Sequence, residues 1–320
     1  MNKTLLILLG IITLSNVSVY LLNENSNSQN VPVIIHKNII EKESFKNIVE
    51  TKPEISFIVP DHQMDVDEVY SQLDKWHEEA PEITEVSIIG KTYKGNDIKY
   101  LRLGKKDGPK VLIVGAIHGN EKLSSMVVMG VIGNLLDNYM NDEHVTELIR
   151  KRDIFFVPIV SVEGYQQNSR TVLSLDPNRN FNGYNLIEIE SIPCIQSLKN
   201  FHKKHNFKAV MSCHNSGKVY FYPWGRSKDS TNVDDNYKDI CQKMGKETGY
   251  RYKQLYKNSV PPFFGYEIDW FHKHGAFAMV AEIGKSFTAK ESEIAEETVN
   301  NFKAIKIFIE EAPLTREQNE

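Results

Sequence analysis

The run Val111–Ile117 constrains the fold most, because it is apolar, rich in β-branched residues and directly followed by the motif His118-Gly-Asn-Glu121. Such a run is typical of a buried strand, and the spacing of the apolar residues after it predicts a helix over 122–138. In an open α/β sheet, ligands bind at the carboxyl ends of the strands. His118 and Glu121 are expected there, and together they offer a zinc ion one nitrogen and one oxygen ligand.

Strand-like and helix-like runs alternate along the chain from residue 61 to residue 312. Strands are predicted at 86–89, 98–103, 111–117, 154–160, 209–213, 219–222 and 277–281, and helices at 64–79, 122–138, 141–151, 188–205, 233–248 and 289–311. The polar stretch 92–96 between two strands predicts a hairpin turn. The alternation predicts a single α/β domain with a central mixed sheet, part parallel and part antiparallel, flanked by helices on both faces.

The two ends of the chain differ from this pattern. Lys3 precedes an uncharged, largely apolar stretch that ends at Leu22. This arrangement predicts either a secretory signal peptide over residues 1–22 or, because the stretch is nearly long enough to span a bilayer, an uncleaved membrane anchor. In both cases the bulk of the chain is exported, as a secreted or periplasmic protein. We interpret residues 23–60 as a linker or lead-in and residues 313–320 as a loose tail.

The composition argues against two classes of protein. Apolar residues make up 41% and charged residues 25% of the 320 residues, which is typical of a globular chain rather than a disordered one. The net charge is −4 and like charges do not form blocks, which argues against nucleic acid as a partner. Cys194, Cys213 and Cys241 form no Cys-x-x-Cys motif; an exported chain can pair two of them, and Cys213 inside an apolar run is interpreted as a core residue.

A zinc site that performs hydrolysis needs a third protein ligand and an open position. His214 is the best candidate, because it follows the predicted buried strand 209–213. The competing histidines are interpreted as surface residues near helix ends: His202, His205, His272 and His274. A second motif with the same spacing, His144-Val-Thr-Glu147, follows no apolar strand and is interpreted as the solvated face of a helix.

A hydrolase of this kind also needs a base that removes a proton from water. Glu282 is the candidate, because it ends the apolar run 277–281, where a buried carboxylate is costly unless it has a partner or a function. The alternative is a structural glutamate paired with a lysine or an arginine.

The segment 176–181, Asp-Pro-Asn-Arg-Asn-Phe, carries a third group of polar residues. Its Arg179 can bind a carboxylate through two parallel hydrogen bonds, with Asn178 assisting. The alternative is an ordinary Asp-Pro turn.

As an ordered set, these residues resemble the zinc metallocarboxypeptidases related to carboxypeptidase A, over about residues 65–310. The resemblance implies one Zn²⁺ per chain, bound by His118, Glu121 and His214. It implies that Glu282 in Ala-Glu-Ile-Gly284 is the general base.

The same resemblance assigns roles to residues between the ligands. It implies that Asn178 and Arg179 hold the terminal carboxylate of a peptide substrate. It also implies that Asp176 orients His118 by contacting the side of the ring that does not face the metal. Arg170 is implied to polarise the carbonyl of the bond to be cleaved.

Two positions depart from the family's pattern. Ser161-Val-Glu-Gly164 stands where the family often has Asn-Pro-Asp-Gly, in a loop that mainly supports the fold. The tyrosine that closes over the substrate in carboxypeptidase A falls near Pro261-Pro262, so Tyr256 or Tyr266 is the candidate replacement. Ile268 stands at the position expected at the base of the side-chain pocket, which implies a preference for an apolar C-terminal residue.

The resulting prediction is an exported zinc carboxypeptidase that removes C-terminal residues from peptides. A second hypothesis keeps the zinc site and assigns it cell-wall peptides that contain diaminopimelate, or N-acyl amino acids. A third hypothesis is a catalytically silent binding module on the same fold, against which the retention of the ligands, Arg170 and Glu282 argues.

Overall fold

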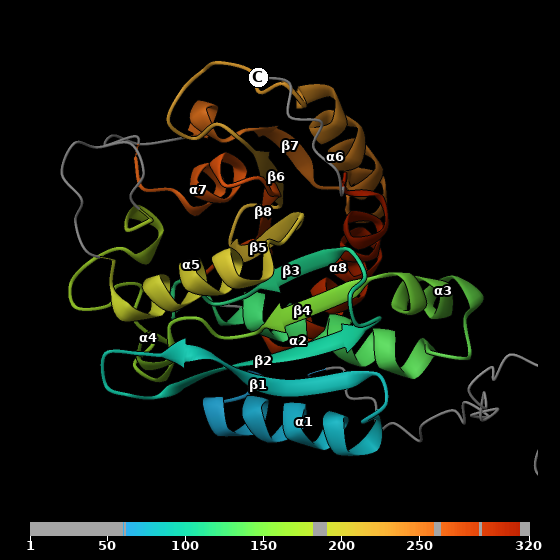
Figure 1. Ribbon diagram of the computed structural model, residues 1–320. Helices are drawn as coiled ribbons and strands as arrows, with labels where there is room; N and C mark the ends of the chain where they lie inside the picture. Colours follow the sequence, from blue (N-terminus) through green and yellow to red (C-terminus); the bar gives the residue numbers. More distant parts are fainter. Residues whose placement is uncertain (1–59, 61, 182–190, 259–263, 288–289, 314–320) are drawn as a thin grey trace, which may run out of the picture. The chain divides into compact units, whose positions relative to one another are not determined.

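The computed structural model describes residues 60, 62–181, 191–258, 264–287 and 290–313. At its centre lies a mixed sheet of eight strands in the order β1-β2-β4-β3-β5-β8-β6-β7 (Figure 1). The strands are β1 Thr84–Lys91, β2 Asp97–Gly104, β3 Lys110–Val114, β4 Asp153–Val157, β5 Ala209–Asn215, β6 Val219–Tyr222, β7 Arg251–Gln254 and β8 Phe277–Ile283. The predicted α/β domain with a central mixed sheet is confirmed.

Helices lie on both faces of this sheet. They are α1 Val66–Glu79, α2 Lys122–Asn138, α3 Glu143–Lys151, α4 Val162–Gln166, α5 Pro193–His205, α6 Asp234–Thr248, α7 Glu267–Lys273 and α8 Glu291–Glu311, with 3₁₀ turns η1 Pro177–Arg179 and η2 Leu255–Asn258. Figure 1 shows α5 and α7 on the near side of the sheet and α2 and α8 behind it. Helix α2 is apolar almost all round, as expected of a helix that packs on both the sheet and α8.

The central strands of the sheet are parallel. Strand β3 pairs with β4 and with β5, and β5 pairs with β8, all in parallel register. Their carboxyl ends therefore meet at one edge, where ligands bind in sheets of this kind. The two strands that flank this centre are antiparallel to it: β2 to β4, and β6 to β8. The predicted hairpin turn 92–96 joins β1 to β2, with the Gly95 N–H donating to the Thr92 carbonyl (3.0 Å).

The ends of all four central strands differ from the prediction, and β4 stops at Val157 rather than at Val160. Strand β3 ends at Val114 rather than at Ile117, because Ala116 takes a left-handed φ of 46° and its N–H donates to the Ser124 hydroxyl (2.9 Å). Residues 115–117 stay buried, so hydrophobicity alone does not reveal where the strand stops. Strands β5 and β8 run farther than predicted, so that His214 and Glu282 lie within them rather than after them.

Three short elements were not predicted. Strand β7 is a polar sequence at the edge of the sheet, with Arg251 and Tyr252 exposed. Helices α4 and α7 have five and seven residues, too few to show a helical period. All three elements lack the alternation on which the sequence analysis depended.

Three predicted segments lie outside the described residues: the signal peptide or anchor over 1–22, nearly all of the linker, and the tail after residue 313. Within the described ranges, no helix is both long enough and apolar enough to cross a membrane. Cys194, Cys213 and Cys241 are all buried and not bonded to one another. The interpretation of Cys213 as a core residue is confirmed, because it is fully buried in β5.

Candidate metal centre

Three predicted ligands meet at the carboxyl edge of the sheet. His118 lies in the turn after β3, Glu121 is the residue that caps the start of α2, and His214 lies in β5. Their ligand atoms all lie within 4.8 Å of one another, and each side chain is at most 2% exposed. Among the described residues, this is the one group of three or more His, Cys, Asp or Glu side chains placed to hold a metal ion.

Both histidines point the same ring nitrogen at Glu121. The Nδ1 atom of His118 lies 2.8 Å from Glu121 Oε1, and that of His214 lies 2.7 Å from Glu121 Oε2. On the outer side, His118 Nε2 contacts Asp176 Oδ1 (2.9 Å) and His214 Nε2 contacts Glu267 Oε1 (2.6 Å). Two imidazole nitrogens and one carboxylate are a donor set that catalytic zinc sites use, and outer carboxylates orient such histidines. The residues therefore fit zinc.

The electrostatics of the site favour a cation. Burial raises the pKa of Glu121, but the neighbouring His214 and His118 outweigh burial and hold that pKa well below its usual range. Burial lowers the pKa of His214, but Glu267 and Glu121 outweigh it and raise that pKa well above its usual value. Two buried carboxylates thus act on one imidazole, and a divalent ion can replace protons in such a site.

Asp176 and Arg170 connect the ligands on one side. Arg170 donates from Nε and Nη2 to Asp176 Oδ2 (3.2 and 3.1 Å), and from Nη1 to Glu121 Oε1 (2.9 Å). Asp176 caps η1, where its Oδ1 accepts the Asn178 N–H (2.9 Å). Burial raises the pKa of Asp176, but the hydrogen bond with His118 and the charge of Arg170 outweigh burial and lower it.

Arg179 is the last residue of η1 and contacts the segment before α7. Its Nη1 donates to the Asn178 carbonyl (2.7 Å), and its guanidinium carbon lies 4.1 Å from the centre of the Tyr266 ring. Gly265 has a φ of 73°, and a Cβ there would lie 2.2 Å from the Arg179 carbonyl oxygen. The close packing of these segments therefore needs glycine at this position.

The structure describes only some of the predicted lid and pocket residues. Pro261-Pro262 fall outside the described residues. Of the two candidate tyrosines, Tyr266 is buried and Tyr256 is half-buried. Ile268 is buried within α7. The assignment of a lid tyrosine and the pocket role of Ile268 stay predictions.

Glu282 lies beside the third ligand. In the parallel pairing of β5 with β8, His214 and Glu282 are partners in register. Burial raises the pKa of Glu282 to about 7. A carboxylate with such a pKa, adjacent to a metal ligand, suits a group that takes and returns a proton near neutral pH.

The turn that carries two ligands packs directly on another backbone. A Cβ on Gly119 would lie 1.9 Å from the carbonyl carbon of Gly164 in α4. The Ser161 hydroxyl that precedes α4 donates to the Ile117 carbonyl (2.5 Å), and Glu163 in α4 accepts from the Asn96 amide (2.9 Å). The segment Ser161–Gly164 therefore supports the metal-binding turn, although its sequence departs from the family pattern.

Replacing Gly119 with alanine is expected to lower both stability and zinc affinity. The added methyl group meets backbone rather than a flexible side chain, so the turn must move. Overpacking of this kind costs about 1–3 kcal/mol, and the shift displaces His118 and Glu121. Thermal unfolding and zinc titration measure the two effects.

Gly95→Ala is the matched control. Gly95 also has a positive φ, of 84°, but no atom lies within 4 Å of a Cβ placed there. We expect this variant to lose about 1 kcal/mol from backbone strain and to keep its zinc affinity. Unchanged zinc binding by Gly119→Ala would contradict the argument from close packing.

Comparison with known proteins decides the family. Residues 69–304 match the family model described as zinc carboxypeptidase. The chain belongs to the zinc carboxypeptidase family. Carboxypeptidase A4 of Mus musculus is 26% identical over 247 residues, which cover 65% of this chain and 59% of that protein. Carboxypeptidase A1 of Bos taurus is 25% identical over 250 residues, which cover 66% and 59%. The chain thus spans about 59% of the length of these relatives.

Solved structures show the same fold. Thrombin activatable fibrinolysis inhibitor superimposes with a TM-score of 0.72 at 19% identity, over 79% of this chain and 75% of that chain. Carboxypeptidase A from Helicoverpa armigera does so with a TM-score of 0.71 at 17% identity, over 81% and 76%. The resemblance and the fold class that the sequence predicted are both confirmed.

The sequence analysis missed one residue of the candidate site, Glu267. It begins α7, is 1% exposed and contacts His214, Asn178 and Ser212. A signal was present, because Ser212 and His214 are polar residues on the same face of an otherwise apolar strand, which indicates a buried polar partner.

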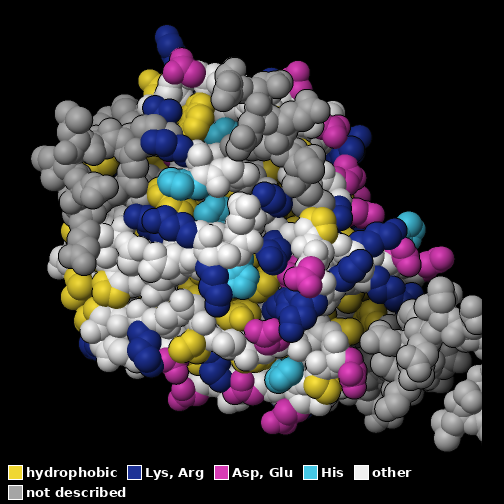
Figure 2. Space-filling view, in the orientation of Figure 1, with side chains coloured by type: hydrophobic (Ala, Val, Ile, Leu, Met, Phe, Trp, Pro, Cys, Tyr) yellow, Lys and Arg dark blue, Asp and Glu magenta, His cyan; other side chains and the backbone are white. Residues whose placement is uncertain are grey.

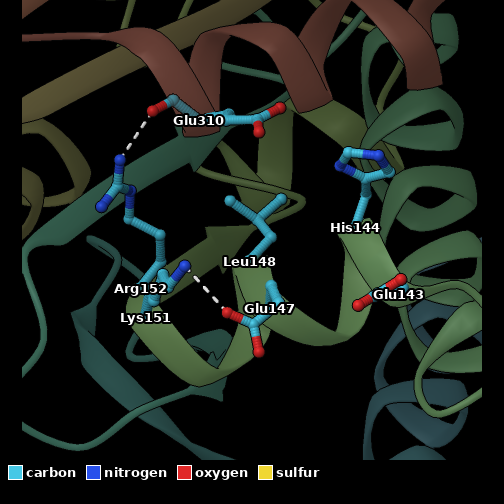
Figure 3. Close-up of a pocket in the computed structure, with 7 residues that line it drawn as sticks. All are labelled: Glu143, His144, Glu147, Leu148, Lys151, Arg152 and Glu310. Atoms are coloured by element: carbon cyan, nitrogen blue, oxygen red, sulfur yellow. Dashed lines mark hydrogen bonds and ion pairs between the residues drawn. The ribbon is translucent and has the colours of Figure 1, made fainter.

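The second His-x-x-Glu motif belongs to no cluster of candidate metal ligands among the described residues. His144 and Glu147 are exposed on α3 beside a pocket that Leu148, Arg152 and Glu310 also line (Figure 3). Their side chains point apart, and Glu147 pairs with Lys151 (2.8 Å). The interpretation as a solvated helix face is confirmed.

The interpretation of the competing histidines as surface residues is wrong for two of them. His202 and His272 are 2% and 3% exposed. His202 packs edge-on against Trp270, and His272 Nδ1 lies 2.9 Å from the Tyr237 hydroxyl. Their rings fill an aromatic cluster, which a sequence reading based on their polar neighbours did not reveal.

The surface fits the charge balance of the sequence. Figure 2 shows basic and acidic side chains together on the face toward the viewer, with hydrophobic side chains in separate small groups.

Proposed function

We propose that this chain is a zinc-dependent carboxypeptidase that hydrolyses the C-terminal bond of peptides. One observation carries the proposal. The cluster of His118, Glu121 and His214 shares one hydrogen-bonded network with Asp176 and Asn178, and Glu282 pairs with His214 on the neighbouring strand. A candidate metal site, the proposed binder of carboxylates and the proposed base are thus connected within one small region.

The chain's own residues then have defined tasks. When bound, zinc polarises a carbonyl and lowers the pKa of water. Glu282 takes the proton from the attacking water and returns it to the leaving amine. Arg170, whose guanidinium already reaches Glu121, stabilises the negative charge that develops on the carbonyl oxygen.

Recognition of a chain end makes the proposed enzyme an exopeptidase. Asn178 and Arg179 bind the terminal carboxylate, for which a guanidinium is well suited. Ile268 in α7 favours an apolar C-terminal side chain. An exported protein, whether released or anchored through residues 1–22, would meet its peptide substrates outside the cytoplasm.

Product analysis by mass spectrometry tests the proposal. Purified protein with zinc is incubated with matched peptides that end in a free carboxylate or in an amide. We expect loss of single C-terminal residues from the free peptides only, fastest for apolar ends, and no loss after removal of the metal with a chelator.

Two results would contradict the proposal. Equal cleavage of the amidated peptides would remove the role of Asn178 and Arg179. If no peptide is cleaved although one zinc ion is bound per chain, ordinary peptides are excluded as the substrate class. Peptides that contain diaminopimelate would then be the next panel.

A further inference from the structure

Glu267 joins two parts of the site that the sequence treats separately. Its Oε1 atom lies 2.6 Å from His214 Nε2 and accepts a hydrogen bond from Asn178 Nδ2 (3.1 Å). Its Oε2 atom accepts a hydrogen bond from the Ser212 hydroxyl (2.9 Å). A carboxylate that is 1% exposed is costly unless such partners compensate it. Two of the partners are the expected metal ligand and the expected binder of the substrate carboxylate.

The contact with His214 fixes which ring nitrogen faces the metal. A carboxylate only accepts hydrogen bonds, so His214 Nε2 must carry a proton when it contacts Glu267. The other nitrogen, Nδ1, also faces a carboxylate oxygen, Glu121 Oε2 (2.7 Å), but both atoms belong to the cluster of candidate ligands, where a metal ion would replace the proton between them. On the opposite side of the site, Asp176 contacts Nε2 of His118 in the same way, so that Nδ1 of His118 faces Glu121.

The contact with Asn178 fixes the orientation of its amide. The backbone N–H of Glu267 donates to Asn178 Oδ1 (2.9 Å), so the amide oxygen faces the start of α7 and the amide nitrogen faces the Glu267 carboxylate. From the other side, Asp176 accepts the Asn178 backbone N–H. Asn178 is therefore held between the two carboxylates that orient the two histidines.

We infer that Glu267 is a positioning residue that orients both the zinc ligand His214 and the substrate-binding Asn178 with a single carboxylate. The part that concerns Asn178 rests on the proposed carboxypeptidase function. The part that concerns His214 rests on the metal site alone. The two parts predict different measurements.

Zinc affinity tests the part that concerns His214. Outer partners of ligating histidines change metal affinity by about 10–100-fold. We expect Glu267→Gln, which keeps one accepting oxygen, to raise the zinc Kd by about 10-fold, and Glu267→Ala, which keeps none, by about 100-fold. Competition with a chromogenic chelator measures both constants without any peptide substrate.

Asp153→Asn is the matched control. Asp153 is as buried as Glu267, at 0% exposed, and accepts two hydrogen bonds from Arg102, from Nε (2.5 Å) and from Nη2 (3.2 Å). It begins β4, at the end of the strand away from the metal centre. This variant is expected to unfold at a lower temperature and to keep the wild-type zinc Kd.

Steady-state kinetics at saturating zinc test the part that concerns Asn178. In Glu267→Ala the Asn178 amide loses its fixed orientation, so KM for peptides with a free C-terminus is expected to rise by a larger factor than kcat falls. Glu267→Gln is expected to recover part of the loss in KM, because its side chain still offers an oxygen to the amide.

Each part can be overturned separately. A folded Glu267→Ala protein with the wild-type zinc Kd would overturn the positioning of His214, as would an equal loss of zinc affinity in Asp153→Asn. An unchanged KM in Glu267→Ala would overturn the part that concerns Asn178. If no peptide is cleaved by the wild-type protein while Glu267→Ala still weakens zinc binding, the proposed function is wrong and the positioning of His214 is supported.

Discussion

Replacing Glu282 with glutamine is expected to lower kcat by about 10²–10⁴-fold while zinc stays bound. Glutamine has nearly the shape of glutamate but cannot accept the proton of the attacking water. Glu282 is not one of the three clustered ligands, so their geometry is kept. The substitution removes the carboxyl group, whose pKa burial raises to about 7, and leaves an amide that does not titrate in this range. Steady-state hydrolysis of a free C-terminal peptide measures the change in kcat.

Zinc content is the control for this variant. One zinc ion per chain in both proteins, with similar unfolding temperatures, assigns the loss of turnover to the base. Glu282→Asp keeps a carboxylate but withdraws it by one methylene group, and we expect activity between those of the wild type and the glutamine variant. Wild-type turnover by Glu282→Gln would exclude Glu282 as the base.

Replacing Glu121 with glutamine is expected to weaken zinc binding by more than about 100-fold, which exceeds the effect of changing a residue that only contacts a ligand from outside. Glu121 contacts both histidines, and its Oε2 atom also accepts the Asn215 N–H (3.2 Å). The substitution removes the anionic ligand and leaves a neutral amide between two imidazoles. Titration of zinc in competition with a chelator measures the affinity.

Glu147→Gln is a control that the chain itself offers. Glu147 belongs to a motif with the same spacing as His118 and Glu121, but it is exposed and pairs with Lys151. Surface substitutions of this kind usually change stability by less than about 0.5 kcal/mol, and zinc affinity is expected to stay at the wild-type value. Equal effects of the two variants would mean that spacing, rather than the strand before the motif, defines the metal site.

The apolar strands that lead to the site residues explain why much of the site was predictable. Buried central strands leave long apolar runs in a sequence, and a polar residue at or near the end of such a run is conspicuous. His118, His214 and Glu282 were all found in this way, and the structure brings His118 and His214 together with Glu121. The exact strand ends were not predictable, because residues 115–117 leave the sheet while remaining buried.

Glu267 had no such signal of its own. It begins a helix of seven residues, which is too short to show a helical period, and it follows no predicted strand. Its partners His214 and Asn178 are 53 and 89 residues away in the chain. Only the folded backbone brings them together, and the same is true of the contact between Gly119 and Gly164. Long-range contacts of this kind are what a reading of local patterns cannot supply.

The order of the strands has a consequence for synthesis of the chain. Strand β8 lies between β5 and β6, although it is made after both of them. Until residues 277–283 emerge and insert, β5 and β6 each lack a neighbour, and unpaired strand edges favour association with other chains. When β8 inserts, Glu282 comes to lie beside His214. A growing polypeptide therefore exposes these two unpaired strand edges at a stage when it does not yet hold the carboxylate proposed as the base.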